Sequence, residues 1–370
     1  MSSHGPDPIS GRKLAPGPLF VVSMWRSGSS LLYALLNKHP QVALMYEADL
    51  LLLRSVFLKP RPLRDWARRW EFWNESFRRH GLSTTDVASA ADFPTAFAAV
   101  HQLYAQRRGA TIWGDKSPNY YDRLNEMADN FPHARFVIVW RDPYGTANSI
   151  LLAASLGNSY FSRKGAVLCG VRGYEIFKRE CDRLLARGKP VCQLNYEDLI
   201  TDTPAVMQSV CQFLQIPYDD SLSILAGADR SAVLNGQHHA NLKSDQIVRG
   251  PRPQRIDSTL RRKISQYLAS WHQLYGAGWP PRPQTTDSRP KPLGKISQFI
   301  DGALYRFWRT RDRISPIVFS FVPISLLQRY RDMKQRRREE AAAHREPADT
   351  EGSPCRGALA KQAANIEVRP

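Results

Sequence analysis

A short segment near the start of the chain combines residues that bind anions. Arg26-Ser27-Gly28-Ser29-Ser30 supplies a guanidinium group, three hydroxyls and a glycine. The apolar run Leu19–Met24 before it predicts a buried parallel strand, and apolar residues at 31, 32, 35 and 36 predict a helix after it. A helix that begins there points free backbone N–H groups and the positive end of its dipole at the turn. The segment therefore predicts a site for phosphate or sulfate.

A second candidate is Lys116, in Trp113-Gly114-Asp115-Lys116-Ser117-Pro118. A short strand is expected to end there, and α/β folds expose their ligand-binding groups at the carboxyl ends of strands. Lys116 is thus either a cation of the site or a lysine of a solvated turn.

Arg141 and Ser149 form a third candidate. Arg141 follows Arg135–Trp140, an apolar and β-branched run expected to lie centrally in a parallel sheet. A helix from about Tyr144 to Leu156 then carries Ser149, eight residues after Arg141. Arginine can donate two N–H groups to phosphate oxygens and a hydroxyl can complete the cage, so the pair predicts a second phosphate site.

The composition limits the class of protein. The chain has 370 residues with 42% hydrophobic content, enough for a packed core, and a net charge of +18 that favours anionic partners. No signal-peptide segment precedes the first strand, and no apolar run reaches the roughly 20 residues of a membrane span. The five cysteines show no metal-ligand spacing: Cys169, Cys181, Cys192, Cys211 and Cys355. These features predict a globular cytoplasmic protein with reduced thiols and no bound metal.

Five motifs occur in a characteristic order: R-S-G-S-S, H-P, G-D-K-S-P, R-x7-S and Y-E-D-L. Over roughly residues 17–280 the chain resembles the sulfotransferases that use 3′-phosphoadenosine 5′-phosphosulfate (PAPS), in particular the protein-tyrosine and bacterial branch. The resemblance implies one α/β domain with a central parallel sheet and a P-loop-like nucleotide-binding loop, related to nucleotide kinases. It also implies PAPS as the co-substrate, without a metal.

The resemblance assigns roles to residues of this chain. It implies 5′-phosphosulfate binding by Arg26, Ser27, Gly28, Ser29 and Ser30. It implies 3′-phosphate binding by Arg141 and Ser149, and a place near the nucleotide for Tyr196, Ser244 and Arg249. Lys116 and Arg26 would stabilise charge on the sulfuryl group.

Sulfuryl transfer to a hydroxyl also needs a base. Glu47 follows the expected strand Val42–Tyr46 and matches the catalytic glutamate of the tyrosine-sulfating relatives. It could instead cap a helix or face solvent, in which case His39, Asp49 or Asp115 would be the base. His39 is less favoured, because the H-P motif resembles a structural feature of the family.

Other functions remain open at this point. A P-loop-like small-molecule kinase would need a Walker lysine, which the loop lacks. A non-enzymatic polyanion-binding module would suit the charge, but no nucleic-acid motif is present, so nucleic acid is not an expected partner. Ala153 stands where the tyrosine-sulfating relatives carry a further arginine, which leaves tyrosine specificity in doubt. The acceptor hydroxyl could belong to a glycan, a lipid, a small alcohol or phenol, or a tyrosine.

The expected organisation has four parts. Residues 1–17 are expected to be a disordered N-terminus, 18–280 the catalytic domain, and 339–370 a disordered tail. The segment 286–338 contains 13 Lys or Arg against 4 Asp or Glu. Its apolar residues Ile296, Phe299, Ile300, Ala303, Leu304 and Phe307 form one helical stripe flanked by Lys295, Arg306, Arg309 and Arg313. This pattern is typical of a helix on an anionic membrane surface, or of an arm that packs on its own domain or on a second subunit.

Overall fold

A computed structural model describes residues 15–58, 66–87, 90–158, 160–163, 165–233, 242, 244–248, 255–275 and 295–343. By its internal contacts the chain divides into a first unit, residues 1–321, and a second unit, residues 322–370. The sheet and all the candidate residues that the structure describes belong to the first unit.

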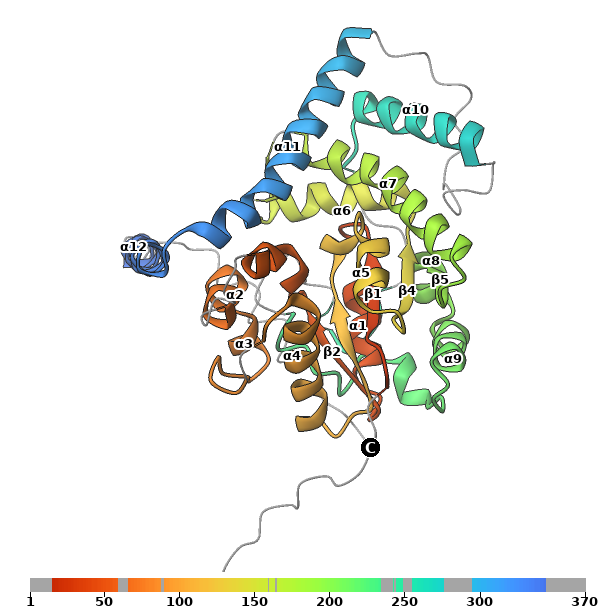
Figure 1. The fold of residues 1–370 in the computed structure, drawn as a ribbon. Helices are drawn as coiled ribbons and strands as arrows, with labels where there is room; N and C mark the ends of the chain where they lie inside the picture. Colours follow the sequence, from red (N-terminus) through yellow and green to blue (C-terminus); the bar gives the residue numbers. More distant parts are fainter. Residues whose placement is uncertain are drawn as a thin grey trace, which may run out of the picture. The chain divides into compact units, whose positions relative to one another are not determined.

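The first unit is built on a five-stranded parallel sheet (Figure 1). The strands are β1 (Leu19–Ser23), β2 (Val42–Tyr46), β3 (Ile112–Lys116), β4 (Arg135–Trp140) and β5 (Val191–Asn195). Their spatial order is β2-β3-β1-β4-β5, and every neighbouring pair is parallel. The α/β fold with a central parallel sheet, as the sequence predicts, is confirmed. Both β1 and β4 lie inside the sheet, in agreement with their apolar sequences.

Helices cover both faces of this sheet (Figure 1). Alternate residues of β1 enter two separate cores: Leu19 and Val21 pack on one face, and Phe20 and Val22 on the other. The first face is covered by α1 (Ser29–Leu36), α8 (Tyr196–Thr201) and α9 (Thr203–Leu214). The second is covered by α2 (Trp66–Asn74), α3 (Ser76–Arg79), α4 (Phe93–Arg107), α5 (Leu124–Asn130), α6 (Pro143–Ser155), α7 (Ala166–Ala186) and α10 (Ser258–Tyr275). Short 3-10 turns are η1 (Leu50–Leu58), η2 (Pro118–Tyr120) and η3 (Asp220–Ser223).

The strand register brings distant segments to one edge of the sheet. Lys116, the last residue of β3, is level with Val21 of β1 and with Tyr46 of β2. The turn after β2 and the loop after β1 therefore start beside Lys116. This carboxyl edge is where parallel α/β sheets place their ligand sites.

The C-terminal segment continues as two helices, α11 (Lys295–Phe321) in the first unit and α12 (Ile324–Ala343) in the second. Helix α11 packs on its own domain, where Oγ of Ser320 lies 2.8 Å from Oγ of Ser55 in η1. Helix α12 extends beyond residue 338, where the sequence predicts a disordered tail to begin. None of the described helices combines the length and the apolar character that crossing a bilayer requires.

Candidate active site

A cavity of about 310 Å³ opens at the carboxyl edge of the sheet. Its size lies at the lower end of the range for small-molecule sites. Nine of the twelve residues that the sequence singles out line it: Arg26, Gly28, Ser29, Ser30, Glu47, Lys116, Arg141, Ser149 and Tyr196. The fold thus gathers residues from five separate segments of the chain around one space.

The loop between β1 and α1 adopts the tight turn that its sequence suggests. Gly28 has φ of 93°, a left-handed conformation that glycine tolerates and most residues avoid. A Cβ atom at this position would lie 2.1 Å from Cδ2 of Tyr196, so the ring packs directly against the glycine backbone. Ser23 donates to Oγ of Ser29 at 2.8 Å and holds the start of α1 against the strand. Only glycine therefore fits between α1 and Tyr196.

Lys116 and Glu47 form an ion pair at the wall of the cavity. Nζ of Lys116 lies 2.7 Å from Oε1 of Glu47 and 3.1 Å from Oγ of Ser30. It also lies 4.2 Å from the centre of the Tyr46 ring. The lysine side chain is only 2% exposed, so its charge is held at a fixed place between the turn after β2 and the first turn of α1. Lys116 is thus part of the cavity wall and does not project into solvent.

The turn that carries Glu47 has an unusual backbone. Both Glu47 and Asp49 have positive φ, 47° and 58°, which costs energy for a residue with a side chain. Groups outside the turn fix it: the amide of Glu47 donates to the carbonyl oxygen of Lys116 at 2.7 Å, and Arg79 donates to the carbonyl oxygen of Glu47 at 3.0 Å. The backbone therefore holds Glu47 toward Lys116.

Asp115 and Asp49 support this turn from inside the protein. The Asp115 carboxylate accepts the amides of Ala48 and Asp49 at 3.2 and 3.3 Å, together with the hydroxyl of Tyr120 at 2.7 Å. Burial, with a contribution from the neighbouring Asp49 charge, raises the pKa of Asp115 to about 7. Burial and the nearby Glu47 raise the pKa of Asp49 to about 6. Neither of the two lines the cavity, so both act as supports for the turn in this arrangement.

Arg141 and Ser149 meet Arg26 on the other side of the cavity. Nη1 of Arg141 donates to the carbonyl oxygen of Arg26 at 2.6 Å, and Nε of Arg26 lies 3.3 Å from Oγ of Ser149. The Arg141 guanidinium lies 4.2 Å from the centre of the Tyr196 ring. Its Nε is buried and has no hydrogen-bond partner among the described residues. An N–H donor left in this state suits an anionic oxygen such as that of a phosphate.

Two of the predicted residues that the structure describes do not line the cavity. The hydroxyl of Ser27 lies 2.8 Å from that of Tyr174, and the side chain is buried on the α6–α7 side. Ser244 is exposed, and its hydroxyl accepts the amide of Gln246. Arg249 lies outside the described residues. His39, the less favoured base, lies away from the cavity, where its ring contacts the carbonyl oxygen of Pro217 at 3.0 Å.

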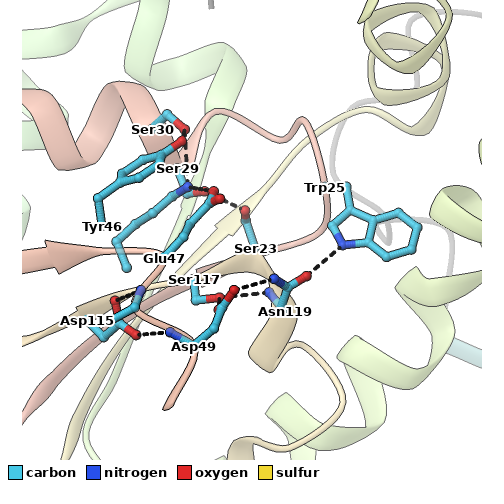
Figure 2. Close-up of polar contacts among 12 residues, drawn as sticks. Ser23, Trp25, Ser29, Ser30, Tyr46, Glu47, Asp49, Asp115, Ser117 and Asn119 are labelled. Atoms are coloured by element: carbon cyan, nitrogen blue, oxygen red, sulfur yellow. Dashed lines mark hydrogen bonds and ion pairs between the residues drawn. The ribbon is translucent and has the colours of Figure 1, made fainter. Parts of the chain in front are cut away.

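An aromatic wall of the cavity was not predicted from the sequence. Trp25, Tyr160 and Phe161 line the cavity together with Asn119. The Trp25 and Tyr160 rings meet edge to face with centres 5.2 Å apart, and Trp25 donates to Oδ1 of Asn119 at 3.4 Å (Figure 2). A tryptophan directly before the loop arginine was a signal available in the sequence. The tryptophans of α2 do not take this role, because Trp66 and Trp70 are buried in the core.

Sequence comparison relates this chain to known proteins. The sequence model of the Sulfotransferase family matches residues 18–220. Protein-tyrosine sulfotransferase A of Caenorhabditis elegans is 24% identical over 251 residues, which cover 66% of this chain and 60% of the relative. Protein-tyrosine sulfotransferase 1 of Danio rerio is 24% identical over 206 residues, covering 55% of this chain and 54% of the relative. The chain thus spans a little over half the length of these relatives.

Two solved structures are similar at lower identity. The sulfotransferase domain from the curacin biosynthetic pathway has 19% identity and a TM-score of 0.46, and the match covers 70% of this chain and 99% of that one. A mouse sulfotransferase complexed with PAP has 11% identity and a TM-score of 0.44, covering 73% of this chain and 89% of that one.

Proposed function

Since this chain belongs to the sulfotransferase family, we propose that it transfers a sulfuryl group from PAPS to a hydroxyl acceptor, with Glu47 as the base. PAPS supplies the sulfuryl group, and adenosine 3′,5′-bisphosphate (PAP) is the product that leaves. The observation that carries the proposal is the contact between Lys116 and Glu47, at the wall of the cavity that Arg26, Arg141 and Ser149 also line.

The two sides of the cavity would bind different parts of the nucleotide. Arg141, whose buried Nε has no hydrogen-bond partner in the described part of the chain, and Ser149 would bind the 3′-phosphate. The amides and hydroxyls at the start of α1, with Arg26, would bind the 5′-phosphosulfate. Most of the catalytic effect in such transfers comes from positioning and from stabilising charge, which fixed cations and amides provide.

Glu47 would take the proton of the acceptor hydroxyl while the new oxygen–sulfur bond forms. The bond from sulfur to the 5′-phosphate oxygen breaks in the same displacement, and the negative charge stays on PAP. We expect Lys116 to act at this point, and its contacts with both Glu47 and Ser30 support this role. Release of Lys116 from Glu47 would free the carboxylate to accept the proton and the ammonium to stabilise the leaving oxygen.

Binding without a metal tests the proposal. Calorimetry in the presence of a chelator should show that PAP binds more tightly than ATP or a single-stranded oligonucleotide. Radiolabelled PAPS with a soluble phenol should then yield a labelled sulfate ester. Binding of magnesium–ATP with no binding of PAP would favour the hypothesis of a small-molecule kinase. Binding of the oligonucleotide alone would favour a polyanion-binding module.

For the partners, we propose a hydroxyl-bearing acceptor and an anionic membrane surface that the basic segment 295–338 contacts. The support for the second partner is an exposed face of α11 that carries apolar and cationic side chains.

A further inference from the structure

Helix α11 contains two acidic residues, and both face the body of the first unit. Asp301 is buried and forms an ion pair with Lys263 of α10 at 2.8 Å. Asp312 forms an ion pair with Arg163 at 3.1 Å. Tyr305 contributes to the same side, 4.8 Å from the guanidinium of Arg172 in α7. The polar residues of α11 therefore attach the helix to its own domain.

The opposite face of α11 is apolar and exposed. Phe299 is 70% exposed and Phe307 is 60% exposed, high values for phenylalanines. Successive exposed residues recur at helical spacing along the whole helix: Phe299, Ile300, Phe307, Ile314, Ile317, Val318 and Phe321. The exposed residues Arg306 and Arg311 flank this stripe, whereas Arg313, also exposed, forms an ion pair with Asp122 at 2.7 Å. We call the seven apolar residues, together with Arg306 and Arg311, the outer face of α11.

The charges on the outer face indicate what can cover it. A protein surface rich in basic residues, including a second copy of the same face, would bring like charges together. An anionic phospholipid surface meets both features, since acyl chains accept the apolar stripe and headgroups attract the arginines.

The inner face of α11 also reaches the aromatic wall of the active site. Asp312 accepts the hydroxyl of Tyr160 at 2.9 Å as well as the guanidinium of Arg163. That guanidinium lies 3.8 Å from the Tyr160 ring centre and 4.5 Å from the ring centre of Trp308 in α11. Tyr160 in turn packs on Trp25. A small cavity of about 70 Å³ lies between this wall and α11, and shares Trp25, Asn119 and Tyr160 with the main cavity.

We propose that the outer face of α11 docks the protein on an anionic phospholipid bilayer, and that the acceptor is an amphiphilic alcohol or phenol held in that bilayer. Its hydroxyl would reach Glu47 past Trp25 and Tyr160, the wall that α11 supports. An aromatic wall in the cavity that Glu47 also lines suits an acceptor with an apolar body. The choice of acceptor rests on the function proposed above, whereas the docking surface does not.

Vesicle co-sedimentation tests the docking surface. The full chain should bind vesicles of equal parts phosphatidylglycerol and phosphatidylcholine, and high salt should release it. The double variant Phe299→Gln with Phe307→Gln should bind at least about tenfold more weakly, because two apolar anchors of the outer face are lost. Ile224→Gln with Leu274→Gln is the matched control, since these side chains are 51% and 64% exposed at other places. Absence of binding by the full chain at low salt, or equal losses in the two double variants, would overturn the docking proposal.

A pair of acceptors tests the substrate class. A long-chain alkylphenol in the same vesicles should be sulfated faster than in neutral phosphatidylcholine vesicles, and the Phe299→Gln, Phe307→Gln variant should lose this advantage. The rate with a soluble phenol should remain unchanged in that variant. Equal rates in anionic and neutral vesicles would contradict the inference. Failure to bind PAP or to sulfate either phenol would instead count against the proposed function, which the vesicle-binding assay does not use.

Discussion

The Asp115 carboxylate accepts a hydrogen bond from the backbone amide of Asp49 at 3.3 Å, deep below the turn that carries Glu47. The side chain of Asp49 continues the chain of contacts, since it accepts the hydroxyl of Ser117 and, at 2.9 Å, the amide group of Asn119 (Figure 2). Asn119 then holds the indole of Trp25. Two buried carboxyl groups thus connect the proposed base to the aromatic wall.

The first prediction concerns the pH dependence of stability. The fold raises the pKa of Asp115 to about 7 and that of Asp49 to about 6, whereas the ordinary pKa of an aspartate is 3.8. At a pH between these values the two side chains are protonated in the folded chain and ionised in the unfolded chain. Their contribution to stability therefore decreases as pH rises from about 4 to about 7, by up to about 1.4 kcal/mol per pH unit for each proton. Asp115→Asn removes one of these ionisations. The difference in unfolding free energy, variant minus wild type, should increase with pH up to about 7 and then level off.

Urea unfolding of both proteins at a series of pH values provides this measurement. His80 and His101, whose pKa values burial lowers to about 4 and about 3, also make stability depend on pH. They are present in both proteins, so their effect cancels in the difference. A difference that stays constant between pH 4 and pH 7 would show that Asp115 remains ionised in the folded protein.

The second prediction concerns Glu47. Glu47→Gln keeps the shape of the side chain and removes its capacity to accept a proton, so turnover with a soluble phenol should decrease by roughly 10²–10⁴. The affinity for PAP should change little, since the residues proposed to bind its phosphates are untouched. Steady-state rates combined with calorimetric binding of PAP separate the two effects. Turnover within a few-fold of wild type would mean that another residue is the base.

The third prediction assigns Arg141 to the 3′-phosphate. Loss of a charge-assisted contact costs about 1.5–3 kcal/mol, so Arg141→Ala should bind PAP about 10- to 150-fold more weakly. AMP lacks the 3′-phosphate, so the affinity for AMP should decrease much less in this variant. Arg141→Lys keeps the charge without the paired N–H donors, so its affinity for PAP should lie between those of the wild type and of Arg141→Ala. Equal losses for PAP and AMP would indicate that Arg141 serves the loop, through its contact with the Arg26 carbonyl, and not the 3′-phosphate.

The fourth prediction concerns Gly28. Gly28→Ala should weaken PAP binding at least about tenfold, because the new methyl group displaces the Tyr196 ring and the left-handed backbone adds about 1–2 kcal/mol of strain. Gly188→Ala is the control, since Gly188 has φ of 65° and open space around it. The free energy of unfolding of Gly188→Ala should decrease because of the backbone strain alone, and its affinity for PAP should stay unchanged. Thermal unfolding and calorimetry of the two variants would show whether the Tyr196 contact matters, and the prediction fails if PAP binding is equally affected in both.

Local sequence is sufficient for the parts of the site that lie within one strand and the helix after it. The strand Leu19–Ser23, the glycine turn and the helix from Ser29 follow from residues that are neighbours in the chain. The same holds for Arg141, in the turn between β4 and α6, and for Ser149 inside α6. Hydrophobic periodicity and turn chemistry act over a few residues, which is why these elements could be predicted with their boundaries nearly correct.

The remaining features depend on contacts between distant segments. Glu47 meets Lys116, 69 residues away, only because β2 and β3 pair in a particular register. Ser27 lies in the loop at the position expected for a phosphate ligand. Because α7 packs against this loop, the Ser27 hydroxyl contacts the hydroxyl of Tyr174 instead. Asp49 and Asp115, two rival bases in the sequence, became supports of the Glu47 turn because the fold buries them. The sequence by itself determined the strands, the phosphate loop and the candidate ligands, whereas strand register and burial, which are properties of the packed chain, decided which of them line the cavity.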